Sequence, residues 1–226
     1  MCGRYILHSP LSDLADRFQF GLNELQVDPN YNISPTASVL TVVADNGRNS
    51  EFMRWGFIPK RHKTRQSIYP IINARSEYVH TNFSFKNALS FRRCLIPANG
   101  FYEWIKEGKQ LFPILFTLGS NKPFAFAGLW EASKDEKTDQ IIKSCTILTT
   151  MPNELVQPIH NRMPVILSQE TESLWLDPMT NKYDELSHLL SPYPSAEMKS
   201  RLVSRKVNSV KNNGPELINL ISITET

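Results

Sequence analysis

The 226-residue chain, of 25.9 kDa, is long enough to bury one sizeable core, and its composition is that of an ordinary soluble globular protein. Its three cysteines, Cys2, Cys94 and Cys145, are odd in number and far apart, which argues against a disulfide framework and against a zinc site. A net charge of +3 is too small to indicate a nucleic-acid partner by itself. No segment of the sequence has the pattern of a signal peptide or a membrane span, so we expect a cytoplasmic protein. We also expect a single domain over residues 1–226 and a monomer that uses no metal and no cofactor.

Hydrophobic patterning predicts mostly strands, with helices interspersed. Ser9 as N-cap and Pro10 as the first helical position, followed by apolar residues at helical spacing through Phe18, predict a helix that Gly21 ends. A β-branched run at 38–44 and its partner at 51–57 are predicted to form a hairpin across Asn46-Gly47. Further strands are expected at 5–7, 70–74, 93–96, 101–106, 110–118, 124–129, 144–149 and 163–167, and further helical segments at 168–176 and 182–190. We therefore expect an α+β fold with mainly antiparallel sheets in a barrel-like single-domain core and peripheral helices.

Cys2 directly follows the initiator, in the run Met1-Cys2-Gly3-Arg4-Tyr5. A residue as small as cysteine at the second position permits removal of Met1, and Cys2 then carries a thiol and a free α-amine on adjacent carbons. An aldehyde can condense with that amine to an imine, and the thiol can close onto the imine carbon to give a five-membered thiazolidine. An internal cysteine cannot do this, because its nitrogen is an amide. Judged by position alone, Cys2 is equally a small apolar residue that opens a first strand.

The segment around Glu103 offers a candidate acid or base. An extended backbone places Glu103 on the same face as Phe101 and Ile105. A carboxylate among apolar neighbours has its pKa raised toward the range that is useful for proton transfer. In the alternative interpretation, Tyr102 and Trp104 face the core and Glu103 faces water.

Two further segments combine residue types that suit ligand binding or catalysis. Strand alternation places Asn73 and Arg75 side by side, where they can hold an oxygen and a phosphate, or else serve as a buried amide and a structural ion pair. His160 lies between prolines and two residues before Arg162. A single histidine is more often a hydrogen-bonding residue than a catalyst, and no Ser/His/Asp order here requires a hydrolase triad.

Several short motifs occur along the chain in one order. They are Met-Cys-Gly-Arg-Tyr at 1–5 and the segments 31–36, 54–59, 72–77, 92–104, 159–164, 207–208 and 212–216. Each is weak alone, but the ordered set is highly specific. From residue 2 to about residue 218 the chain resembles the SOS-response-associated peptidase (SRAP) family, whose members shield abasic sites in DNA by covalent crosslinking.

The resemblance implies a role for each candidate residue. Cys2 is expected to form the thiazolidine with the ring-opened aldehyde of an abasic deoxyribose in single-stranded DNA, which protects the site during replication or repair. Asn73 is expected to orient the amino terminus and the sugar, Glu103 to act as general acid and base, and His160 to assist sugar ring opening and crosslink reversal. The residues expected at phosphates are Arg4, Arg75 and Arg162. Because an imine at C1′ acidifies C2′, abasic-site lyase activity is a further expectation.

Two other functions stay open, and the chain departs from the family's pattern in two regions. The chain could be a thiol peptidase that uses Cys2 to remove Met1 or to attack peptides, or a non-enzymatic module that binds single-stranded DNA with Cys2 inert. Bacterial relatives commonly carry Trp in the loop after the Trp-Gly segment, whereas residues 60–65 of this chain form a dense cationic run. That run is either a solvated loop or part of the DNA path. Relatives often place a basic residue shortly after the Asn-Ala-Arg strand, where this chain has Asn82 and Phe83.

Overall fold

The computed structural model describes residues 2–22, 25–60, 70–134 and 138–221. Its strands are β1 (Tyr5–Leu7), β2 (Asn30–Ile33), β3 (Ser38–Ala44), β4 (Arg48–Trp55), β5 (Asn73–Arg75), β6 (Arg93–Ala98), β7 (Gly100–Glu107), β8 (Gln110–Leu118), β9 (Phe124–Lys134), β10 (Ile141–Thr150), β11 (Met163–Pro164), β12 (Ile166–Leu167) and β13 (Met198–Leu202). Its α-helices are α1 (Leu11–Phe18), α2 (Lys86–Phe91), α3 (Gln169–Leu176) and α4 (Tyr183–Leu186). Short 3₁₀ turns are η2 (Ser76–Tyr78), η3 (Ser187–Leu190), η4 (Ser195–Glu197), η5 (Arg205–Asn208) and η6 (Pro215–Ile218).

Five of the strands close into a barrel. β10 pairs in parallel with β4, and antiparallel pairs then lead from β4 to β3, from β3 to β6 and from β6 to β9. β9 returns to β10 in a long antiparallel pairing, so that the ring is complete. β5 lies along β10 in parallel, while β11 pairs with the end of β10 and β12 with the first part of β9. The predicted α+β fold with a barrel-like, mainly antiparallel core is therefore confirmed.

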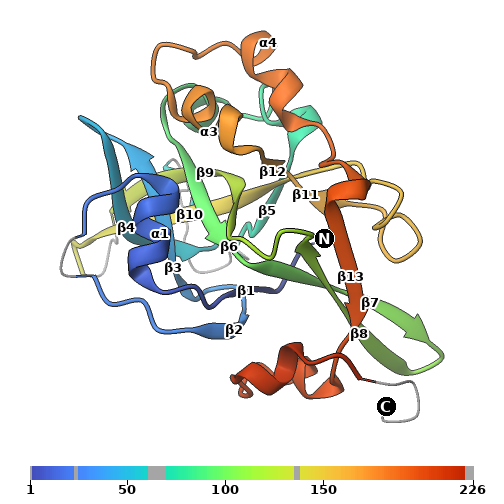
Figure 1. Cartoon of the computed structure of the whole chain (residues 1–226). Helices are drawn as coiled ribbons and strands as arrows, with labels where there is room; N and C mark the ends of the chain where they lie inside the picture. Colours follow the sequence, from blue (N-terminus) through green and yellow to red (C-terminus); the bar gives the residue numbers. More distant parts are fainter. Residues whose placement is uncertain (1, 23–24, 61–69, 135–137, 222–226) are drawn as a thin grey trace.

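A second sheet, entirely antiparallel, has the strand order β13-β8-β7-β1-β2. Its long β7–β8 hairpin extends away from the barrel strands, and the chain's first strand, β1, is enclosed between β7 and β2 (Figure 1). Aromatic residues join the two layers, since Tyr5 of β1 packs edge-on against Trp55 and Phe126 of the barrel. The amino-terminal residues are thereby fixed at the junction of sheet and barrel.

Both faces of this sheet are covered near β1. Phe101 belongs to the main core, while Tyr102 lies in a second apolar cluster with Ile6 and Val207. Glu103 shares the face of Phe101 and is only 3% exposed. The alternative in which Glu103 faces water is wrong, because the barrel covers one face of β7 and the carboxy-terminal segment covers the other.

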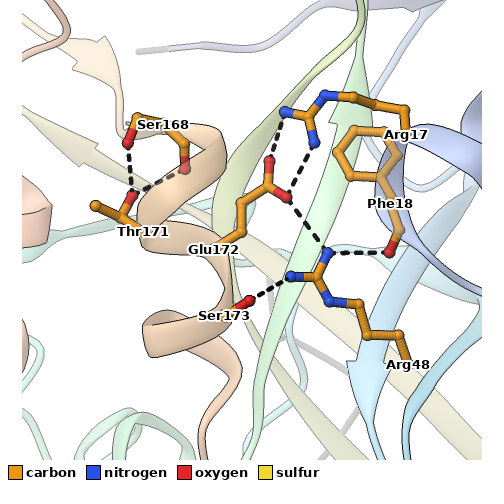
Figure 2. Close-up of polar contacts among 7 residues, drawn as sticks. All are labelled: Arg17, Phe18, Arg48, Ser168, Thr171, Glu172 and Ser173. Carbon is orange, nitrogen blue, oxygen red and sulfur yellow. Dashed lines mark hydrogen bonds and ion pairs between the residues drawn. The ribbon is translucent and has the colours of Figure 1, made fainter.

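An ion triad attaches two helices to the barrel. Glu172 of α3 is fully buried, and Figure 2 shows it between Arg17 of α1 and Arg48 of β4. Arg17 binds both carboxylate oxygens, at 2.7 and 3.1 Å, and Arg48 lies 3.4 Å from one of them. Arg48 also donates to the carbonyl of Phe18 at 3.0 Å and to the Ser173 hydroxyl at 2.9 Å. The triad thus holds α1 and α3 against the edge of β4.

Most predicted elements are present, with shifted ends. The first helix ends at Phe18 and is followed by Gln19 in the left-handed region (φ 57°), so Gly21 does not end it. The predicted hairpin has a three-residue loop, because Ala44 pairs with Arg48, so β4 begins earlier than expected. β2, α2 and β13 were not predicted. No helix in the described part of the chain is long and apolar enough to cross a membrane.

Candidate functional site

Cys2 is fully buried just before β1. The side-chain amide of Asn73, on β5, donates a 2.8 Å hydrogen bond to the Cys2 carbonyl oxygen. Burial raises the pKa of the Cys2 thiol, and the negative charge of Glu103 raises it further. The structure therefore brings three of the predicted residues together: Cys2 from the segment before β1, Asn73 from β5 and Glu103 from β7.

The turn between β6 and β7 fixes the register that places Glu103 beside Cys2. The side-chain oxygen of Asn99 accepts hydrogen bonds from the backbone N–H groups of His8 and Ser9, at 2.8 and 3.1 Å. At Gly100 a Cβ atom would lie 2.6 Å from the Phe116 carbonyl oxygen, so a side chain would push β8 away. The Asn-Gly pair of the motif thus locks β1 onto a β7 that is tightly paired with β8.

Glu103 has the electrostatics of a group that exchanges protons near neutrality. Burial raises its pKa to about 7, while the charge of the amino terminus lowers it in part. A carboxyl group with that pKa is present in both protonation states at neutral pH, as general acid–base catalysis requires. The surroundings of Glu103 therefore suit the proton transfers of imine chemistry.

His160 is half-buried in the segment that leads to β11. Its ring nitrogen Nδ1 lies 3.0 Å from both the backbone nitrogen and the carbonyl oxygen of Arg162. Burial lowers the pKa of His160, and the positive charges of the amino terminus and of Arg162 lower it further. The amino-terminal charge lowers the pKa of both His160 and Glu103, so both side chains lie near the start of the chain.

The three predicted phosphate ligands differ in their surroundings. Arg75 is exposed on β5, beside Asn73. Arg162 is 8% exposed, and both of its terminal nitrogens bind the carboxylate of Glu77, at 2.6 and 2.9 Å. Arg4 is half-buried and is held by the protein as well. Their contacts with phosphate stay predictions.

Arg4 is held by motifs to which the sequence assigned no role. Its guanidinium donates to the side-chain oxygen of Asn32 at 2.5 Å and to the Val207 carbonyl at 2.9 Å. The amide nitrogen of Asn32 in turn donates to the carbonyls of Ser209 and Asn212, at 3.0 and 2.8 Å. The sequence signal for these residues was that the motifs at 31–36, 207–208 and 212–216 occur in the family's order, which does not predict that they pair.

Sequence reasoning also missed two features that bear on the site. The motif at 72–77 contains Glu77 but gives no sign that Glu77 binds Arg162. The side-chain oxygen of Asn73 is buried and has no hydrogen-bond partner among the described residues, so it can accept from a ligand next to Cys2.

Lys60, the first residue of the cationic run, is exposed, and the rest of that run lies outside the described residues.

The described residues offer little to a metal or to a disulfide. They contain no group of three or more His, Cys, Asp or Glu side chains that could hold a metal ion. All three cysteines are buried and free.

Known proteins resemble the chain over nearly its whole length. The family model described as SOS response associated peptidase (SRAP) matches residues 1–210. A protein of Bacillus subtilis (strain 168) named abasic site processing protein YoqW is 42% identical, over 96% of this chain and 99% of its own length. Abasic site processing protein YedK of Escherichia coli (strain K12) is 28% identical, over 96% of this chain and 99% of its own length. A crystal structure of a Bacteroides thetaiotaomicron protein, 22% identical, matches with a TM-score of 0.89 over 98% of this chain and 100% of that chain, and shows the fold alone.

Proposed function

The chain belongs to the SOS response associated peptidase family, and we propose that it processes abasic sites in single-stranded DNA by crosslinking to them through Cys2 after removal of Met1. The observation that carries this proposal is the convergence of Asn73 and Glu103 on Cys2. The relatives named abasic site processing proteins support the choice of substrate.

The reaction begins at the amine. The uncharged α-amine of Cys2 attacks the aldehyde carbon of the ring-opened sugar and forms a C–N bond, giving a carbinolamine. Protonated Glu103 donates a proton to the departing hydroxyl, water leaves, and the nitrogen returns its proton to the Glu103 carboxylate, so that a neutral imine remains. The sulfur then attacks the imine carbon while its proton passes to the nitrogen, and a thiazolidine results. One water is lost overall, and nothing is oxidised or reduced.

The remaining residues support this chemistry. The hydrogen bond from Asn73 fixes the Cys2 backbone, so the amine and the thiol approach the aldehyde from a defined direction. Neutral His160 can take up or deliver a proton at the sugar as its ring opens and as the crosslink reverses. If C2′ loses a proton before the sulfur closes the ring, β-elimination cleaves the strand, which is the lyase activity.

The two alternatives are less well supported. A thiol peptidase needs the thiolate, and both burial and the neighbouring Glu103 raise the pKa of the Cys2 thiol. A purely non-covalent DNA-binding module has no use for a carboxyl group whose pKa is about 7 beside that thiol.

We propose that the protein acts as a cytoplasmic monomer that associates with the nucleoid when bound to DNA.

The test separates the α-amine from the thiol. Protein that begins at Cys2 and protein that retains Met1 are incubated with abasic single-stranded DNA, and intact masses are measured beside a denaturing gel. We expect a heat-stable adduct, smaller by one water than the sum of its parts, only from the first protein. A cleaved test peptide would favour the peptidase, and non-covalent binding alone would favour the binding module. A stable adduct from protein proven to keep Met1 would overturn the mechanism.

A further inference from the structure

Glu77 and Arg162 form an ion pair next to the site rather than within it. Both terminal nitrogens of Arg162 bind the two carboxylate oxygens of Glu77, at 2.6 and 2.9 Å, in the bidentate geometry that fixes a guanidinium most firmly. One of these nitrogens also donates to the Thr149 carbonyl of β10 at 2.5 Å. Glu77 itself lies on η2, directly after β5. The side chain of Arg162 is thus tied to both of the paired segments β5–η2 and β10.

The backbone of the same arginine holds the His160 ring. Its N–H lies 3.0 Å from Nδ1 of His160, and its carbonyl oxygen lies at the same distance. A second backbone contact, from the His160 N–H to the Val156 carbonyl at 2.9 Å, fixes the start of this turn. The orientation of the ring therefore depends on where the Arg162 backbone lies, and that depends on what its side chain binds.

We infer that Glu77 is a positioning residue for His160 and acts through Arg162. The inference rests on the proposed function, because it gives His160 a task at the sugar. Asn73 and Glu77 then bracket one short segment, which holds the Cys2 carbonyl at one end and the support of His160 at the other. A single rigid element aligns the nucleophile with its proton-transfer partner.

Charge as well as geometry links Glu77 to the ring. The charges of the amino terminus and of Arg162 both disfavour the imidazolium form of His160. The carboxylate of Glu77 offsets the charge of Arg162. Replacement of Glu77 by an uncharged residue should therefore lower the pKa of His160 further, in addition to loosening the ring.

The experiment compares Glu77→Gln and Glu77→Asp with Glu51→Gln, which removes one acid from the more exposed Lys143–Glu51 pair. The three readouts are the single-turnover rate of crosslinking to an abasic oligonucleotide, the affinity for an intact oligonucleotide of the same sequence, and the pKa of the His160 ring by NMR. For Glu77→Gln we expect crosslinking to slow about 10- to 100-fold, as misplacement of a reacting group typically does, with a lower His160 pKa and unchanged affinity. Glu77→Asp keeps the charge, so the pKa of its His160 should equal that of the wild type. Its crosslinking rate should lie between the rates of Glu77→Gln and the wild type. Glu51→Gln should match the wild type.

Two results would overturn the inference. An unchanged rate and an unchanged His160 pKa in folded Glu77→Gln would show that the ion pair is only structural. Tighter DNA binding by that variant, with His160 unaffected, would assign Arg162 to a phosphate instead. If Glu77→Gln does not fold, a wild-type rate for Glu77→Asp, whose carboxylate is withdrawn by one methylene, overturns it as well. Failure of the wild type to crosslink would reject the proposed function, whereas the NMR comparison would still test the positioning.

Discussion

Asn73 and Cys2, which are 71 residues apart in sequence, are joined by a 2.8 Å hydrogen bond from the side-chain amide to the backbone carbonyl. The bond connects the strand that continues the barrel, β5, with the segment that enters the second sheet, β1. Its effect is to fix the backbone of the residue whose nitrogen and sulfur both reach one aldehyde carbon in the proposed reaction. The site is thus held together by backbone and side-chain contacts between two sheets.

Loss of the Asn73 donor should slow crosslinking without abolishing DNA binding. Asn73→Asp preserves size but presents an acceptor to the Cys2 carbonyl, so the backbone of Cys2 is no longer held. We expect the crosslinking rate to fall by about 10- to 100-fold, as measured in single-turnover gels. Asn49→Ala, which removes an exposed side-chain hydrogen bond to Asp45, is the matched control and should react like the wild type. A wild-type rate for Asn73→Asp would contradict the role assigned here.

Glu103→Gln should slow crosslinking and change its pH dependence. The wild-type rate should rise with pH as the amine loses its proton, and fall again as Glu103, whose pKa is about 7, loses the proton that it must donate. The glutamine variant should be slower by roughly 10²–10⁴-fold and should lack the limb near pH 7. Rates over a pH series measure this. A variant whose profile and rate equal those of the wild type would make Glu103 structural.

The same substitution makes a prediction about stability. Because the pKa of Glu103 is raised in the folded protein, the folded state binds this proton more tightly than the unfolded state. The contribution of Glu103 to stability is therefore lost as pH rises from its ordinary value of 4.5 through about 7. Glu103→Gln has no such proton, so its Tm relative to the wild type should increase across this window. A Tm difference that does not vary with pH would contradict the raised pKa.

Arg75 should contribute to the non-covalent step. It is exposed beside Asn73, where a phosphate of the bound strand can reach it, so Arg75→Ala should weaken initial binding and reduce the slope of log affinity against log salt by about 1. We expect a larger loss than for Lys63→Ala, since Arg75 can bind a phosphate in bidentate fashion. Fluorescence anisotropy at several salt concentrations measures both. Equal losses would assign the DNA path to the cationic run, and the completed thiazolidine should survive high salt in either case.

Glu172 should matter for stability and not for chemistry. Glu172→Gln leaves Arg17 and Arg48 without their buried partner, which typically costs about 3–5 kcal/mol of unfolding free energy. Denaturant titration measures the loss, and crosslinking below the melting temperature should be unchanged. The comparison is Glu51→Gln, at a more exposed ion pair, which should cost about 0–1 kcal/mol. Equal costs at the two positions would show that the triad does not hold α1 and α3.

Much of the fold could be predicted from local pattern. Alternation along residues 101–106 placed Glu103 with Phe101, and β8 was predicted with its observed ends. β2 and β13 were not predicted, because polar residues dominate their sequences and neighbouring strands provide their burial. α2 was not predicted because it has only six residues, too few to show a helical period. The local sequence could not show whether Glu103 is buried or faces water, because the residues that cover each face of β7 come from segments far away in the chain.

The sequence by itself determined which groups can react: an aminothiol behind a removable methionine, with a carboxyl, an amide and an imidazole in recognisable motifs. A local motif fixes a residue's chemistry and its face on a strand. Only the tertiary structure decided that β1 is enclosed between β7 and β2, that β5 lies along β10, and that Glu77 engages Arg162, 85 residues away. Strand periodicity is the same whichever partner a strand has, so pairing depends on the packing of the whole chain. That packing raises the pKa of Glu103 and determines which arginine is left exposed.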